Sequence, residues 1–220
     1  MTRLADLTTP EVGDRRVLLL PIGSLEQHGP HLPLDTDTVI ATTVAQRAAV
    51  AVPAAVVAPA IAIGASGEHA GFAGTLSIGT DVMASALVEI VRTAGAEFER
   101  VVVVNGHGGN LDAVRIAVTR CAEEGRRLTA WHAALVGGDA HAGATETSVM
   151  LAIDPNRVRL DRAEPGVVAP LADILDDLRA GGLAAVTPNG VLGDPTTADA
   201  AVGETILDEW VRQVVELLRS

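Results

Sequence analysis

The chain has 220 residues and a formal net charge of -12, and all 16 of its basic residues are arginines. This charge excludes nucleic acid as a partner, because phosphates are bound by clustered positive side chains. With 48% hydrophobic residues, a chain of this length can bury one large core, so we expect a single domain over residues 1–220.

Cysteine content and apolar patterning indicate a cytoplasmic protein. The single cysteine, Cys121, cannot form an internal disulfide, and the first residues lack the apolar stretch of a secretory signal. The longest apolar segment, residues 48–65, is interrupted by Pro53, Pro59 and Gly64. It therefore predicts a helix end, a loop and a buried strand rather than a membrane span.

Strands and helices alternate along the chain. Short aliphatic runs that end in polar or glycine residues predict buried strands at residues 16–22, 56–63, 100–105 and 128–133. Apolar residues at helical spacing predict helices at 38–50, 86–99, 110–124 and about 171–179, with a last helix carrying the stripe after Gly203. Thr80 or Asp81 is expected to cap the helix that begins there. This alternation predicts an α/β fold with a mainly parallel sheet covered on both faces.

The loop after the first strand combines residues that bind metal ions. Glu26 and His28 are two apart in an extended segment, so their side chains point to the same side, and a proline-rich turn can return Asp37 to them. Clustered carboxylates and imidazoles beside an apolar strand are costly unless a cation binds them. We expect these three residues to be metal ligands, while His31 and Asp35 support the ligands or lie on the surface.

The loops after the second and third strands are also rich in polar residues. Glu68 and His69 lie on a glycine-rich loop, where a solvated pair and a functional pair are both possible. His107 lies in the sequence NGHGGN between a strand and a helix, and we expect it to be a metal ligand. A phosphate site is the alternative for this turn, but its spacing fits neither common phosphate-binding motif.

Two further candidates follow the fourth strand. His141 precedes a predicted helix, and Glu146 lies in the first turns of that helix. A glutamate there can either interact with the helix dipole or bind a metal, and chemistry alone does not decide between them. His132, inside the fourth strand, is expected to be a core residue, and residues 190–198 form a turn that can face a substrate.

Four segments in this order resemble the creatininase family of metal-dependent amidohydrolases: SLEQHGPHLPLDTD, GxSGEH, NGHGGN and HAGxTETS. The resemblance covers nearly the whole chain. It implies a three-layer α/β/α sandwich with a two-metal site, usually in homo-oligomers. Shorter segments (GASGEH with FAGT, GGDAHAG and GVLGDPTTA) are similar to a peptidase branch of the family, which trims a modified precursor peptide to release its C-terminal Val-Tyr-derived core.

The resemblance also implies a ligand set. Glu26, His28, Asp37 and His107 match family ligands, with Asp37 bridging the two ions. Creatininase itself has a ligating glutamate two residues after the histidine of its NGH motif, where this chain has Gly109. In members with the HAGxxETS motif the missing carboxylate is supplied by the glutamate of that motif, here Glu146, which argues against creatinine as the substrate.

The expected reaction is amide hydrolysis by a hydroxide held between two divalent ions, with zinc, iron or manganese as the metal. One ion would contact Glu26, His107 and Asp37, and the other His28, Glu146 and Asp37. His141, or else Glu68, would pass a proton to the leaving amine. The alternatives are a family hydrolase acting on creatinine or a formamide, and a noncatalytic subunit whose metal holds its loops together.

Overall fold

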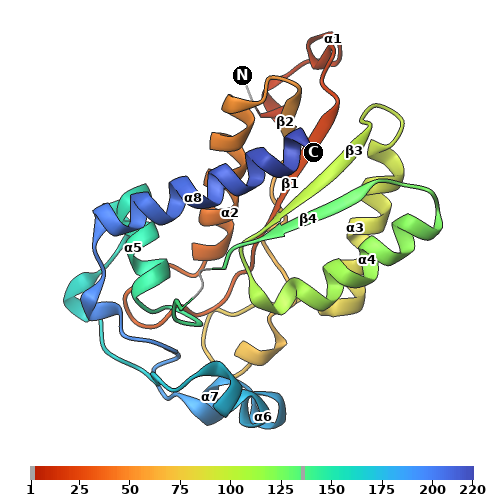
Figure 1. Cartoon of the computed structure of the whole chain (residues 1–220). Coiled ribbons are helices and arrows are strands. Elements are labelled where there is room, and N and C mark those ends of the chain that lie inside the picture. The colour runs from red at the N-terminus through yellow and green to blue at the C-terminus, as the bar shows by residue number, and fades with distance from the viewer. Residues whose placement is uncertain (1–2, 135–136) are drawn as a thin grey trace.

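The computed structural model describes residues 3–134 and 137–220. At the centre of the described residues is a four-stranded sheet in the order β2-β1-β3-β4, and every neighbouring pair of strands is parallel (Figure 1). The strands are β1 (Val17–Ile22), β2 (Ala55–Val57), β3 (Arg100–Asn105) and β4 (Leu128–His132).

Helices cover both faces of this sheet, which gives the expected three-layer α/β/α sandwich (Figure 1). Helices α2, α5 and α8 pack on one face and α3 and α4 on the other, while α6 and α7 lie together beyond the end of the sheet. The helices of the described residues are α1 (Thr9–Val12), α2 (Thr36–Ala51), α3 (Thr80–Ala94), α4 (Leu111–Glu123), α5 (Ala144–Ile153), α6 (Leu171–Gly181), α7 (Leu183–Val186) and α8 (Ala200–Arg219).

The alternation of side chains along β1 divides the core into two halves. Leu19 packs with α2 and α8, whereas Leu18 and Leu20 pack with α3 and α4. Successive side chains of a strand point to opposite faces, so a sheet covered on both sides requires apolar residues at every position. The unbroken run of β1, which is buried at all six residues, meets this requirement.

The register of the sheet determines where the site forms. Ile22 of β1 pairs with Asn105 of β3, which in turn pairs with His132 of β4. Three strands therefore end at the same level, and the loops that follow them leave from one edge. Ligands of parallel sheets bind at this carboxyl edge.

The second strand is shorter than predicted. The sequence indicated residues 56–63, but the ladder of β2 ends at Val57, and only Ile61 rejoins the sheet, through an isolated bridge to Ile22. Pro59 lies between these two points and has no backbone N–H to donate to a neighbouring strand.

The helix predicted at 86–99 is displaced toward the N-terminus. α3 spans Thr80–Ala94, and Phe98 packs into the core from the turn that follows the helix. The predicted cap is wrong as well, because Gly79 is the N-cap and no side chain caps this end. The helix at 171–179 is confirmed and extends to Gly181 as α6.

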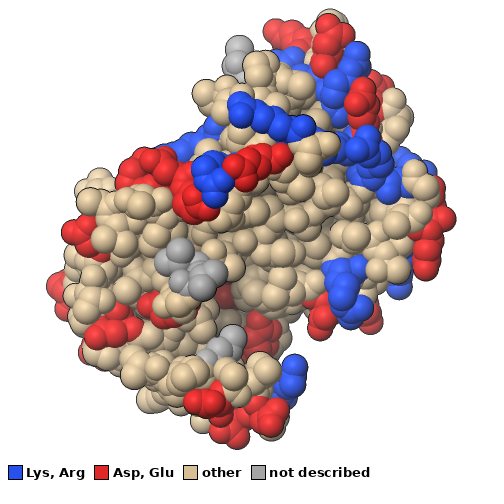
Figure 2. Space-filling model, viewed as in Figure 1, with Lys and Arg blue, Asp and Glu red and all other residues tan. Residues whose placement is uncertain are grey.

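Charged side chains are unevenly distributed over the surface. On the face shown in Figure 2, arginines gather mostly in the upper half, near the two termini, whereas acidic side chains are spread over the whole face. Among the described residues, no helix combines the length and apolar character needed to cross a membrane.

Candidate metal centre

Glu26, Asp37 and His107 converge from three separate segments at the carboxyl edge of the sheet. Glu26 follows β1, Asp37 lies in the first turn of α2, and His107 follows β3. His107 Nδ1 is 3.2 Å from Glu26 Oε1 and 3.2 Å from Asp37 Oδ2. All three side chains are buried, and Ser24 donates a hydrogen bond of 2.6 Å to Asp37 Oδ2.

Glu26 provides the strongest indication of a cation. Both of its carboxylate oxygens are fully buried, and neither accepts a hydrogen bond within the described structure, although His69 Nε2 lies 3.2 Å from Oε1. A buried carboxylate without hydrogen bonds is destabilising by several kcal/mol, roughly, unless a positive charge compensates it. The residues around Glu26 therefore fit a divalent ion.

His28 and Glu146 complete the acidic cluster. His28 Nε2 lies 2.9 Å from Asp37 Oδ1. Burial alone would lower the pKa of His28, but the negative charges of Asp37, Glu146 and Glu26 raise it to about 10. Burial raises the pKa of Glu146 to about 7, opposed by His28 and reinforced by Asp37. The raised pKa values mean that His28 and Glu146 hold their protons more strongly than usual, which reduces the net negative charge of the cluster. A bound cation would balance this charge instead.

His141 lies against the same cluster. Its ring centroid is 4.4 Å from that of His28 and 4.6 Å from that of His69. Burial, reinforced by the charges of His28 and His69, lowers the pKa of His141 well below its usual value. Three sets of these residues could each hold a metal ion: Glu26 with His69 and His141, His28 with His141 and Glu146, and Glu26 with His28 and Asp37.

Glu68 and His69 do not form a solvated pair. His69 is buried with its Nε2 beside Glu26, while Glu68 is partly exposed with its Oε1 3.3 Å from His107 Nε2. Burial alone would raise the pKa of Glu68, but its contacts with His107 outweigh this and lower it. The sequence left His69 open; its signal was the Glu-His pair on a loop that follows a strand of the sheet.

At Gly109 the structure shows no room for a side chain. A Cβ atom at this position would overlap Glu68 Oε1, the Ala65 carbonyl oxygen and His107 Nε2. The space next to Gly109 is thus filled by the approach of Glu68 to His107.

The loops that carry these residues are held by buried amides and a capping aspartate. Asn110 accepts a hydrogen bond from the Ala65 backbone N–H and donates to the Gly23 carbonyl oxygen. Asp139 accepts hydrogen bonds from the backbone N–H groups of Ala144 and Thr145, at the start of the helix that carries Glu146. Unpaired N–H groups at a helix start are stabilised by such acceptors.

The weaker candidates lie around the centre. His31 is fully buried and contacts the Thr147 hydroxyl at 2.8 Å, next to Glu146, whereas Asp35 is at the surface in an ion pair with Arg157. His132 is the last residue of β4 and is only half-buried, so the expectation of a core histidine is wrong.

A cavity of about 610 Å³ opens beside the histidines. Its lining includes the polar side chains of Glu68, His69, His107 and His141. Leucines from α6, α7 and the 190–198 loop also line it, namely Leu175, Leu178, Leu183 and Leu192. Leu192 pairs with His141 through backbone hydrogen bonds, so the 190–198 loop faces the cavity. Arg179 also lines the cavity and supplies a positive charge there.

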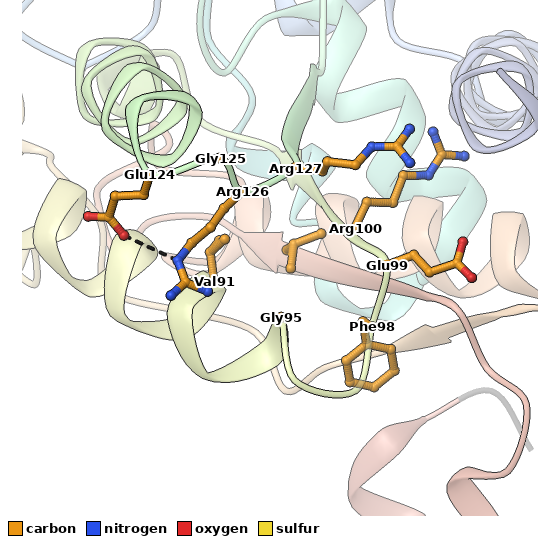
Figure 3. A pocket seen from close by; sticks show the side chains of 10 residues that line it. Val91, Gly95, Phe98, Glu99, Arg100, Glu124, Gly125, Arg126 and Arg127 are labelled. Carbon is orange, nitrogen blue, oxygen red and sulfur yellow. Dashed lines mark hydrogen bonds and ion pairs between the residues drawn. The ribbon is translucent and has the colours of Figure 1, made fainter.

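A second cavity, of about 340 Å³, lies at the opposite edge of the sheet, where β3 and β4 begin (Figure 3). Glu124 and Arg126 form an ion pair at this cavity, and Arg100 and Arg127 extend together in another direction (Figure 3). Because it lies at the amino ends of the strands, it is separate from the histidine cluster.

Comparisons with known proteins agree on one family. The family model described as creatinine amidohydrolase (Creatininase) matches residues 5–218. The chain is 53% identical to the mycofactocin precursor peptide peptidase of Mycobacterium ulcerans (strain Agy99), over 90% of this chain and 82% of the relative. It is 50% identical to the protein of that name from Mycolicibacterium smegmatis (strain ATCC 700084 / mc(2)155), over 92% and 84%.

Solved structures give the same result. A mutant creatininase matches with a TM-score of 0.82 and 26% identity, covering 100% of this chain and 98% of its own. Among the similar structures, one is described as creatininase Mn and another as a mutant of the Zn-Zn type. The chain therefore belongs to the creatininase family.

Proposed function

We propose that this chain is a metal-dependent peptidase that cleaves a modified precursor peptide and releases its C-terminal, Val-Tyr-derived core. The main observation in support of a hydrolase is the buried carboxylate of Glu26, which accepts no hydrogen bond among the described residues and lies within a cluster of histidines and carboxylates. The substrate is proposed from the 53% identity to a mycofactocin precursor peptide peptidase. Residues 1–220 act as a single domain.

Two divalent ions are proposed for the site. Glu26, His107 and Asp37 would hold one, and His28, Glu146 and Asp37 the other, which is supported by the 2.9–3.2 Å contacts within the first trio and between His28 and Asp37. Mixed nitrogen and carboxylate ligands suit zinc, iron or manganese.

Bound metal ions would lower the pKa of a water molecule and polarise the amide carbonyl. His141 borders both the acidic cluster and the cavity, so its ring can take the proton of the attacking water and deliver it to the leaving nitrogen. Glu68, at the cavity wall beside His107, is the second candidate for this transfer. No serine or cysteine nucleophile is needed.

The shape of the cavity supports a substrate larger than creatinine. A volume of about 610 Å³, lined by leucines as well as polar side chains, accepts a bulky apolar group. Gly109, in place of the ligating glutamate of creatininase, also separates this chain from the creatinine hydrolases.

Incubation of metal-loaded protein with the matured precursor peptide tests the proposal by mass spectrometry. We expect release of the C-terminal core, with Glu146→Gln and His141→Ala both losing activity. Turnover of creatinine or a formamide without peptide cleavage would establish the small-amide alternative instead. An intact, metal-loaded protein that hydrolyses none of these substrates would contradict the proposal and favour a noncatalytic subunit.

We further propose that the enzyme is a homo-oligomer. This is supported by a groove of about 660 Å³ along the edge strand β4, lined in part by Val114, Val118, Leu128 and Leu217. Light scattering coupled to size-exclusion chromatography checks this, and a mass of 22.6 kDa in solution would contradict it.

A further inference from the structure

Gln27, between the proposed ligands Glu26 and His28, joins three loops of the site through its side chain. The residue is buried, and its Nε2 donates a 2.9 Å hydrogen bond to the Gly190 carbonyl oxygen. The same Nε2 lies 3.2 Å from His69 Nδ1 and 3.1 Å from His141 Nε2. One amide group thus contacts His69 and His141, two histidines of the site that are not among the proposed ligands.

The orientation of this amide is determined by its neighbours. Gln27 Oε1 accepts a hydrogen bond of 2.8 Å from the Gly29 backbone N–H, and its Nε2 faces the Gly190 carbonyl oxygen. If the amide oxygen and nitrogen were exchanged, the amide N–H₂ group would face the Gly29 N–H donor, and the amide oxygen would face the Gly190 carbonyl oxygen. The amide N–H₂ group therefore faces the histidines.

The tautomer of His141 follows from a backbone contact. His141 Nε2 lies 2.9 Å from the backbone carbonyl oxygen of Gln27, which can only accept a hydrogen bond. Nε2 must therefore carry the proton, because a lone pair there would face the lone pairs of the carbonyl. Neutral His141 then has its lone pair on Nδ1, which lies 3.9 Å from Glu26 Oε1.

The tautomer of His69 follows by counting hydrogens. One amide hydrogen of Gln27 goes to Gly190, and protonated Nε2 of His141 cannot accept the other, which leaves His69 Nδ1 as its acceptor. An imidazole nitrogen that accepts a hydrogen bond has no proton of its own. Neutral His69 thus carries its proton on Nε2, 3.2 Å from Glu26 Oε1.

We propose that Gln27 is a positioning residue that makes His69 and His141 present opposite properties to the site: a proton at Nε2 of His69 and a lone pair at Nδ1 of His141. The catalytic role of this arrangement rests on the proposed function, whereas the assignment of the two tautomers does not depend on it. Both rings are the same tautomer, but they turn opposite edges toward Glu26.

The two histidines then have different roles. His141 Nδ1 can accept the proton of the attacking water as its oxygen bonds to the amide carbon, and returns that proton to the leaving nitrogen as the C–N bond breaks. His69 is a donor beside Glu26 and is not a metal ligand, even though it lies close enough to Glu26 and His141 to form a possible metal-binding set with them.

Histidine tautomers can be measured directly by NMR. Long-range ¹H–¹⁵N spectra of protein labelled at its 6 histidines separate proton-bearing nitrogens from those with a lone pair. At about pH 8, above the usual histidine pKa, we expect His69 and His141 both to carry their proton on Nε2, with and without zinc. A proton on Nδ1 of His69, a doubly protonated His69, or replacement of its Nε2 proton by zinc would overturn the proposal.

Gln27→Glu tests the cause of the His69 tautomer. A carboxylate cannot donate, so the proton of His69 should move to Nδ1, whereas His141 keeps its tautomer because its partner is the backbone carbonyl. Should this variant fail to fold, Gln27→Met removes the donor without adding charge, and His69 should then populate both tautomers. Gln213→Glu, a change of the same chemistry beside Trp131, should leave both rings unchanged. An unaltered His69 in a folded Gln27 variant would overturn the proposal.

Kinetics with the precursor peptide complete the test. For Gln27→Glu we expect kcat to fall on the order of 10²-fold with KM changed less than about threefold, since His69 loses the proton that it directs toward Glu26 while the leucines that line the cavity are unchanged. A rise in KM with unchanged kcat would contradict the positioning role. If the wild type shows the expected tautomers but cleaves no peptide, the proposed function fails and the tautomer assignment stands.

Discussion

Some side chains of this site can approach each other only because a neighbouring residue has no side chain. His107 and Glu68 approach each other over Gly109, whose missing Cβ leaves the space for both. Close-packed interiors tolerate an added carbon poorly, because neighbouring groups must move off their preferred positions. This glycine therefore helps to shape the proposed metal centre, although it has no side chain that could bind a metal.

Gly109→Ala is expected to impair the centre by displacing Glu68 and His107. Overpacking of this kind costs about 1–3 kcal/mol, so we expect lower stability together with weaker zinc binding, measured by urea denaturation and isothermal titration calorimetry. Gly108→Ala is the matched control, because no atom lies within 4 Å of its added Cβ. Equal zinc affinity in the two variants would contradict this account of Gly109.

Glu26→Gln is expected to abolish the stabilisation of the protein by metal. A ligand that binds only the folded state adds about 2.7 kcal/mol at 100 times its dissociation constant, and the wild type should gain about this amount from zinc. The variant should gain little, because an amide cannot supply the negative charge. Thermal unfolding with and without zinc measures the difference, and Glu97→Gln at the surface is the control. A full zinc shift in Glu26→Gln would show that Glu26 is not a ligand.

The convergence of Glu26, His28, Asp37 and His107 could be predicted from sequence, because each follows a strand or begins a helix at one edge of a parallel sheet. The parts played by His69 and Gln27 could not. His69 reaches Glu26 only because the loop of residues 64–75 folds back over the edge, and Gln27 is recognisable only from the three loops that meet at its amide. Such contacts depend on loop conformation, which leaves no periodic signal in sequence.

Among the secondary-structure elements, helix α5 contributes both to the stability of the fold and to the geometry of the site. It carries Glu146 in its first turn, and Asp139 provides acceptors for its first backbone N–H groups. Ala142, between these two residues, donates its N–H to Glu146 Oε2 at 2.6 Å. The start of this helix thus positions Glu146, whose role local chemistry left open and which the family resemblance assigned to the metal ligands.

Asp139→Ala is expected to lower stability by about 1 kcal/mol through loss of the helix acceptors, and to weaken zinc binding because Glu146 loses its fixed position. Asp199→Ala, which removes the equivalent acceptor from α8, should cost a similar amount of stability and leave zinc affinity unchanged. Urea denaturation and calorimetry of both variants provide the comparison. A similar loss of zinc affinity in both would argue against a specific role for α5.

The elements most accurately predicted are those with an unbroken apolar run or a strong helical stripe. β3 matches its predicted bounds, and β1 and β4 do so within one residue. The errors lie where local signals conflict: Pro59 ends β2 early, and the turn that begins at Gly95 stops a helix whose apolar pattern continues to Phe98.

At the scale of the whole molecule, one sheet contributes side chains to two apolar cores. The sheet thereby connects the helices on its two faces. Trp131 and Trp210 lie in the core formed with α2 and α8, with ring centroids 5.9 Å apart. Since β1 and β3 contribute alternate residues to both cores, neither core can be exposed without the other.

The metal-free protein is therefore expected to unfold in one cooperative transition. Tryptophan fluorescence reports on one core and far-UV circular dichroism on all helices, so their midpoints in urea should coincide. Separate midpoints would show that the chain contains more than one folding unit.

The number of metal ions bound per chain tests the central claim most directly. Elemental analysis of protein loaded with zinc or manganese and then freed of excess metal should give two ions per chain in the wild type and fewer in Glu26→Gln. A folded wild-type protein that retains no ion from either metal would contradict the claim that these loops form a hydrolytic metal centre.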